Sequence, residues 1–255
     1  MPASKIPDSH NRRLISPIGG IRCVFFDAAG TLIRTVESVG ETYAKIGSRY
    51  GFEASPEQLD KSFRSAFREM VADPPGLGED RIWWRTIVQR TFTLAGAAPS
   101  EAGVNSERFE SCFTELFDFY GEAAAWQIYP DVEPALKQLA DAGFDLWVLS
   151  NFDARLHPVL KGLGLTPRFK GVIASGDIGL SKPDPKIFAA ACAQADWDAA
   201  QCAHVGDCPK ADLDGAQSAG LSPYLLDRPN TDISHFVRDL RIGKFPTCIN
   251  VSDSG

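Results

Sequence analysis

The sequence lacks any run of about 18 consecutive apolar residues, the length that a membrane-spanning helix requires. It also lacks a surplus of positive charge, because 26 Lys and Arg residues against 33 Asp and Glu residues give a formal net charge of −7. No cluster of Lys and Arg is long enough to follow a nucleic-acid backbone. We therefore expect neither a membrane nor a nucleic acid among the partners.

The six cysteines include no Cys-x-x-Cys pair and no His/Cys cluster with the spacing of a zinc site. A chain of 255 residues with 44% hydrophobic content can bury a full core without disulfides. Residues 1–16 lack the apolar segment and cleavage site of a secretory signal. These absences predict free thiols and a cytoplasmic location.

The first strong pattern is the short apolar run at residues 21–26, which ends abruptly at the segment Asp27-Ala28-Ala29-Gly30-Thr31. A run of this length bounded by glycine predicts a buried strand that feeds a loop. Apolar residues at helical spacing follow, without a convincing strand, as far as residue 126. We expect an insert of about four helices, with helical segments at 43–50, 59–71, 82–94 and 109–120.

Beyond Pro130 the pattern alternates between helix and strand, which is typical of βαβ units and a parallel sheet. Asp131 is expected to cap the first of these helices and Gly143 to end it. The predicted strands are 144–149, 171–174, 203–206 and 223–226, and the helices between them are 155–163, 185–195 and 210–219. The fold class is therefore α/β with a parallel sheet.

Polar residues follow four of the predicted strands, at or beyond the point where each strand ends. Ligands of such sheets bind beyond the carboxyl ends of the strands, so these residues should converge on one edge. They are Asp27, the pair Ser150 and Asn151, Lys182, and Asp207.

The residue types suit phosphoryl transfer. A carboxylate such as Asp27 can attack phosphorus to give an acyl-phosphate. Asp207 and Asp212 offer the oxygen ligands that Mg²⁺ prefers. A positive charge at Lys182, together with the Ser150 hydroxyl and the Asn151 amide, could hold phosphate oxygens. Histidines 157, 204 and 235 have no second ligand at metal spacing and are interpreted as structural or surface residues.

Four segments resemble, in order and approximate spacing, the four motifs of the haloacid dehalogenase-like (HAD) hydrolases. They are Asp27-Ala28-Ala29-Gly30-Thr31, Leu149-Ser150-Asn151, Ser181-Lys182-Pro183-Asp184-Pro185 and residues 206–212. The segment 150–153, the pair Trp83-Trp84 and residues 91–96 are further similar to one subgroup of that family. We expect the tryptophan pair to pack within the insert rather than stack on a substrate.

The resemblance implies a Rossmann-like, doubly wound core of residues 21–35 and 127–255, a helical cap of residues 36–126, and an N-terminal extension of residues 1–20. It implies that Asp27 is the nucleophile, that Thr31 and Ser150 orient phosphate, and that Lys182 stabilises charge. The implied metal site comprises Asp27, the backbone carbonyl of Ala29, Asp207 and Asp212, with Mg²⁺ as cofactor.

One position departs from the family pattern. Phosphatases of this family usually have a second aspartate where this chain has Ala29, and that acid protonates the leaving oxygen and activates water. General acid–base help of this kind contributes typically ~10²- to 10⁴-fold. We expect slow hydrolysis of ordinary phosphoesters unless another group substitutes.

Several interpretations of Ala29 stay open. An acid from the cap, or Asp153, could replace the missing group, or the leaving group could need no protonation. The reaction could instead be dehalogenation or phosphonate hydrolysis, although the latter uses a cap lysine and only Lys45 and Lys61 are offered. The chain could also be an impaired phosphate-binding or interaction protein. Retained metal acids favour a Mg²⁺-dependent phosphatase acting on a small phosphorylated metabolite.

Overall fold

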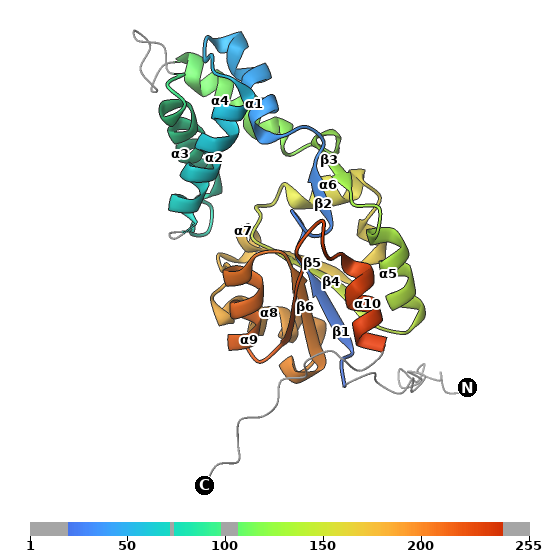
Figure 1. Ribbon diagram of the computed structural model, residues 1–255. Helices are drawn as coiled ribbons and strands as arrows, with labels where there is room; N and C mark the ends of the chain where they lie inside the picture. The colour runs from blue at the N-terminus through green and yellow to red at the C-terminus, as the bar shows by residue number, and fades with distance from the viewer. Residues whose placement is uncertain (1–19, 72–73, 98–106, 242–255) are drawn as a thin grey trace, which may run out of the picture.

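The core of the protein is a five-stranded parallel sheet with the strand order β5-β4-β1-β6-β7 (Figure 1). The computed structural model describes residues 20–71, 74–97 and 107–241, so the expected N-terminal extension lies outside the described part except for Gly20. This topology confirms the predicted α/β class. The strands are β1 (Cys23–Phe26), β4 (Asp145–Ser150), β5 (Gly171–Ala174), β6 (Cys202–Gly206) and β7 (Ser222–Leu225).

Helices cover both faces of the sheet, which explains why the central strand is apolar throughout. Successive side chains of a strand point to opposite faces. Val24 and Phe26 accordingly join a buried cluster on one face, and Cys23 and Phe25 join a cluster on the other. The first face is covered by α5 (Val132–Asp141), α6 (Leu156–Gly162) and α10 (Ile233–Arg241), the second by α8 (Pro185–Ala195) and α9 (Gly215–Ser218).

Four helices inserted after β1 form a group of their own, seen beside the sheet domain in Figure 1. Capping boxes at Ser38 and Ser55 start the first two helices, since each side chain accepts the N3 backbone N–H and the N3 side chain accepts the cap N–H. Phe52, Phe92 and Phe109 are fully buried at the centre of the group. The helices are α1 (Val39–Gly47), α2 (Pro56–Met70), α3 (Asp80–Leu94) and α4 (Glu107–Phe119).

Two short strands flank the helical insert and were not predicted. The strands β2 (Ile33–Thr35) and β3 (Trp126–Ile128) pair antiparallel, so that the two chain connections to the insert run side by side. Three-residue strands are too short to show an alternating pattern in the sequence. Helices α7 (Ser175–Ile178) and α10 were also missed.

The expected cap at Asp131 is wrong, whereas the expected helix end at Gly143 is correct. Asp131 has helical backbone angles and makes no side-chain cap hydrogen bond, because a capping residue needs an extended backbone. Its carboxylate instead accepts hydrogen bonds from Arg228 at 2.8 and 3.0 Å and from the Ile233 N–H at 2.9 Å. Gly143 follows the last helical turn with φ of +85°.

The described cysteines are free thiols, as predicted; Cys248 lies outside the described residues. Within the described ranges, no helix has both the length and the hydrophobicity needed to cross a bilayer.

Candidate active site at the carboxyl edge of the sheet

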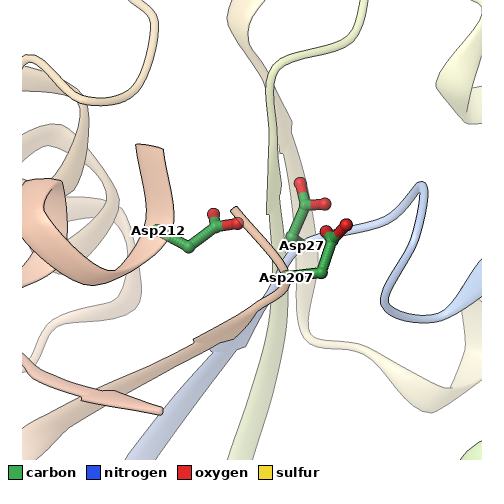
Figure 2. A group of neighbouring side chains, drawn as sticks. All are labelled: Asp27, Asp207 and Asp212. Atoms are coloured by element: carbon green, nitrogen blue, oxygen red, sulfur yellow. The ribbon is translucent and has the colours of Figure 1, made fainter. Parts of the chain in front are cut away.

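Asp27 lies directly after β1, at the central position of the sheet edge (Figure 2). Its N–H donates to the Val205 carbonyl at 2.9 Å, which extends the strand pairing by one residue and fixes its backbone. Its Oδ1 accepts a hydrogen bond from Lys182 Nζ at 2.8 Å. Among the described residues no hydrogen bond occupies Oδ2, so this oxygen is available to a ligand. Asp27 retains 8% exposure, at the wall of a cavity.

Lys182 is buried and reaches the site from the loop between α7 and α8. Asn151, at the end of β4, holds this loop: its Oδ1 accepts the Lys182 N–H at 2.7 Å and its Nδ2 donates to the Lys182 carbonyl at 2.8 Å. The Asn151 amide is therefore engaged in positioning Lys182, and its substrate-binding role stays a prediction. Burial alone would lower the pKa of Lys182, but the charges of Asp212 and Asp27 raise it above its ordinary value.

Asp212 is buried behind this pair and accepts three hydrogen bonds. Its Oδ1 accepts from Lys182 Nζ at 2.6 Å and lies 2.8 Å from His204 Nε2, and its Oδ2 accepts the Cys208 N–H at 2.9 Å. Burial alone would raise the pKa of Asp212, but Lys182 and His204 hold it well below its ordinary value. Asp212 thus orients Lys182 toward Asp27.

His204, interpreted from the sequence as a structural or surface residue, is a buried structural residue in contact with the site, a contact that the sequence did not predict. It is fully buried in β6, with the Phe188 ring edge-on at a centroid distance of 5.2 Å. Burial lowers its pKa, and its Nδ1 has no hydrogen-bond partner, so the ring is neutral and donates its Nε2 proton to Asp212. The available signal was a polar residue within the apolar run before Gly206.

Asp207 follows β6 and faces the cavity, beside Asp27 (Figure 2). Its partial removal from water and the negative charges of Asp27 and Asp212 raise its pKa to about 7. The buried Thr31 hydroxyl lies 3.4 Å from its Oδ1. Gly30 is required at this point, because its φ is +89° and a Cβ there would lie 2.4 Å from Asp207 Oδ2.

The donor set fits a hard divalent cation. Oxygen atoms of Asp27, Asp207 and Asp212 lie within 4.8 Å of one another. Ala29 also lines the cavity, and its carbonyl accepts none of the backbone hydrogen bonds described outside helices and strands. Three carboxylates face a single ammonium, so the site has an excess of negative charge that a cation would offset. The oxygens of Asp212 are already engaged by Lys182, His204 and the Cys208 N–H. A cation would therefore be held mainly by Asp27, Asp207 and the Ala29 carbonyl.

A cavity of about 510 Å³ lies between this edge of the sheet and the helical insert. Ser150 lines it, as the predicted phosphate-orienting role requires, whereas Thr31 is fully buried behind Asp207. Asp153 also lines it, but Arg155 occupies both of its oxygens, at 2.8 Å on Oδ1 and 2.6 Å on Oδ2. Trp83 and Trp84 pack against each other with ring centroids 5.0 Å apart, as expected, and they also line the cavity.

Residues 21–220 match the family model described as haloacid dehalogenase-like hydrolase. This chain belongs to that family of hydrolases. It is 33% identical over 224 residues, 86% of each chain, to "Haloacid dehalogenase-like hydrolase domain-containing protein 3" of Homo sapiens, in agreement with the subgroup resemblance.

Solved structures with a similar fold include phosphatases and dehalogenases. A defluorinating L-2-haloacid dehalogenase has a TM-score of 0.69 at 18% identity, with 87% of this chain and 95% of that chain covered. The HAD-hydrolase YfnB from Bacillus subtilis, whose structure has magnesium bound, has a TM-score of 0.64 at 18% identity, covering 84% and 91%. At these identities the similarity concerns the fold alone.

Proposed function

We propose that this hydrolase is a Mg²⁺-dependent phosphatase of a small phosphorylated metabolite, with a phospho-Asp27 intermediate. The observation that carries the proposal is the charge arrangement at the sheet edge. Lys182 bridges Asp27 and Asp212 at 2.8 and 2.6 Å, and Asp207 adds a third carboxylate. This arrangement repels a phosphate dianion on its own and attracts one once a divalent cation is present.

In the proposed reaction, the free oxygen of Asp27 attacks phosphorus and forms an acyl-phosphate while the ester P–O bond breaks. Lys182 holds the attacking carboxylate in place and balances charge on the transferring group. Ser150 offers a hydroxyl to a phosphate oxygen. A water molecule then attacks the same phosphorus and loses a proton to solvent, while the bond between Asp27 and phosphorus breaks, which releases phosphate and restores the Asp27 carboxylate. Bound Mg²⁺ would supply the positive charge that lets anionic nucleophile and anionic substrate approach.

The absence of an acid at position 29 governs the first step. Since Ala29 cannot protonate the departing oxygen, that oxygen must leave as an anion or take a proton from water or from another acid of the cavity. Asp153 does not fill the role, because Arg155 occupies both its oxygens. Among the described residues of the cap, Asp80 is the only carboxylate that lines the cavity.

The residues of the cavity fit the two alternative chemistries less well than they fit phosphate hydrolysis. Phosphonate hydrolysis through a Schiff base requires a cap lysine in the cavity, but Lys45 pairs with Glu37 and lines a different pocket, and Lys61 is exposed. The resemblance implies that metal-free dehalogenases lack the acidic layout found here. The layout of Asp207 and Asp212 therefore favours phosphate chemistry.

The test is a panel of phosphoesters and acyl phosphates, with chloropropionate as a further substrate, assayed with Mg²⁺ and with chelator. We expect Mg²⁺-dependent phosphate release that falls to background in Asp27→Asn. The matched control is Asp214→Asn, an exposed aspartate two residues after Asp212, which should retain native activity. Equal phosphate release by the native protein and Asp27→Asn would refute the proposal, and metal-free chloride release would identify a dehalogenase.

A further inference from the structure

The cavity wall opposite the catalytic carboxylates points to the substrate class. We propose that the preferred substrates are phosphate monoesters of an uncharged phenol, whose ring packs against the aromatic side chains of the cap. This inference rests on the proposed phosphatase function and narrows it. Two independent observations support it: the side chains that the cap contributes to the cavity, and the residue at position 29.

Aromatic rings dominate the cap side of the cavity. Phe67 stacks on Trp84 with ring centroids 6.0 Å apart, and Trp83 meets Trp84 edge-on at 5.0 Å. All three rings are only partly buried, although they line the cavity, so each keeps surface that a ligand can cover. Aromatic pairs in such offset or edge-on arrangements are stabilised beyond the burial of their area. A flat ring is therefore the shape that this wall recognises best.

The same wall offers no partner for a second negative charge. Among the described cap residues that line the cavity there is no Lys or Arg, and the only carboxylate is Asp80. Arg155, which enters from the core, is held by Asp153 and lies 3.4 Å from the centroid of the Phe117 ring. A carboxylate on the leaving group would meet no cation among these cap residues. This arrangement disfavours small anionic phosphates.

Arg34 also lines the cavity, but it lies on β2 and not in the cap, with its guanidinium carbon 5.3 Å from the centroid of the Tyr129 ring. The cations among the lining residues, Arg34, Arg155 and Lys182, therefore all lie outside the helical insert.

Position 29 supports an aromatic leaving group on separate chemical grounds. A phenol has a pKa of about 10, whereas water, which resembles an aliphatic alcohol in acidity, has a pKa of about 15.7. A phenolate can therefore leave phosphorus without a proton, and an alkoxide cannot do so readily. Because Ala29 supplies no acid at the position where phosphatases of the family have one, the chemistry favours the aryl esters that the cavity wall also accommodates. A volume of about 510 Å³ is within the usual range for small-molecule sites.

A binding experiment tests the aromatic wall independently of turnover. The probe is 2-naphthylmethylphosphonate, which cannot be hydrolysed at a P–O ester bond, titrated with Mg²⁺ into the catalytically inactive Asp27→Asn protein by calorimetry. Phosphonoacetate serves as the small anionic comparison. We expect the naphthyl ligand to bind at least ~10-fold more tightly, and Trp84→Ala in the same background to remove about 10-fold of its affinity. The control is Ile82→Ala, on the same helix, where the side chain is 69% exposed and does not line the cavity. This substitution should leave the affinity for both ligands unchanged.

A turnover experiment completes the test with 2-naphthyl phosphate, the saturated decahydro-2-naphthyl phosphate and phosphoglycolate. We expect kcat/KM to fall in that order, with Trp84→Ala lowering the naphthyl value about 10-fold and the phosphoglycolate value less than about 2-fold. Equal binding of the two phosphonates, or an equal effect of Trp84→Ala on both, would overturn the substrate class. Naphthyl-selective binding with no turnover of any ester would refute the phosphatase function while leaving the aromatic site supported.

Discussion

Removing the Asp212 carboxylate should destabilise the protein because it leaves a buried ammonium short of a partner. In the native fold this carboxylate accepts hydrogen bonds from Lys182, His204 and the Cys208 N–H. In the Asp212→Ala variant, the Lys182 ammonium keeps only one of its two carboxylate partners, Asp27. Breaking a buried ion pair from one side costs roughly 3–5 kcal/mol of unfolding free energy. For a protein of this size that corresponds to a fall in Tm of about 6–20 °C.

The assay is urea unfolding of the metal-free protein in chelator at pH 7, followed by circular dichroism. Asp214→Ala is the matched control, since this exposed aspartate lies in the same short helix as Asp212, Pro209–Asp214. We expect its free energy of unfolding to change by no more than about 0.5 kcal/mol. An unchanged unfolding midpoint for Asp212→Ala would refute the argument that the Lys182–Asp212 contact organises the site.

The pH dependence gives the same prediction an independent check. The folded pKa of Asp212 lies below its unfolded value, so the unfolded state binds more protons and the carboxylate contributes stability above about pH 4. That contribution is lost as the pH falls further toward the folded pKa. The stability difference between the native protein and Asp212→Ala should therefore be smaller at pH 3 than at pH 7, and a constant difference would contradict the assignment.

Three further predictions concern the metal site and its surroundings. Because the pKa of Asp207 is raised to about 7, Mg²⁺ should raise Tm more at pH 8 than at pH 5.5, and Asp207→Asn should remove this pH dependence in a thermal-shift titration. Gly206→Ala should destabilise the fold by ~1–3 kcal/mol in urea unfolding, since its Cβ would lie 2.2 Å from Asp212 Cγ. Ala29→Asp should increase kcat for alkyl phosphates by at least ~10-fold and for aryl phosphates by less; a uniform increase would argue against a missing leaving-group acid.

The sequence predicted that Asp27, Lys182 and Asp207 meet at one edge of the sheet, and the reason is topological. Asp27, Lys182 and Asp207 each follow an apolar strand or lie in the loop beyond one. Parallel strands place all their carboxyl ends on one side, so residues far apart in the chain must meet there. The four-helix insert was predicted for a different reason: apolar residues at helical spacing are a local signal that can be read directly from the sequence.

Short or context-dependent features could not be predicted. The strands β2 and β3 have three residues each, and their pairing depends on both chain connections to the insert meeting in space. Asp131 has the residue type of a helix cap, but the approach of Arg228 and Ile233, about a hundred positions away, determined its role. Sequence spacing contains no information about such contacts.

The sequence by itself determined the family, the parallel sheet and the residues that gather at its edge, because the alternation of strands and helices along the chain is a local signal and a parallel sheet places all its strand ends on one side. Only the tertiary structure decided that His204 supports Asp212, that Asn151 holds the Lys182 loop, and that Trp83 and Trp84 line the cavity beside Asp27. These roles depend on how helices and loops pack across the sheet edge. A hydrogen bond forms only when donor and acceptor are about 3 Å apart, so small differences in that packing decide which side chains become partners.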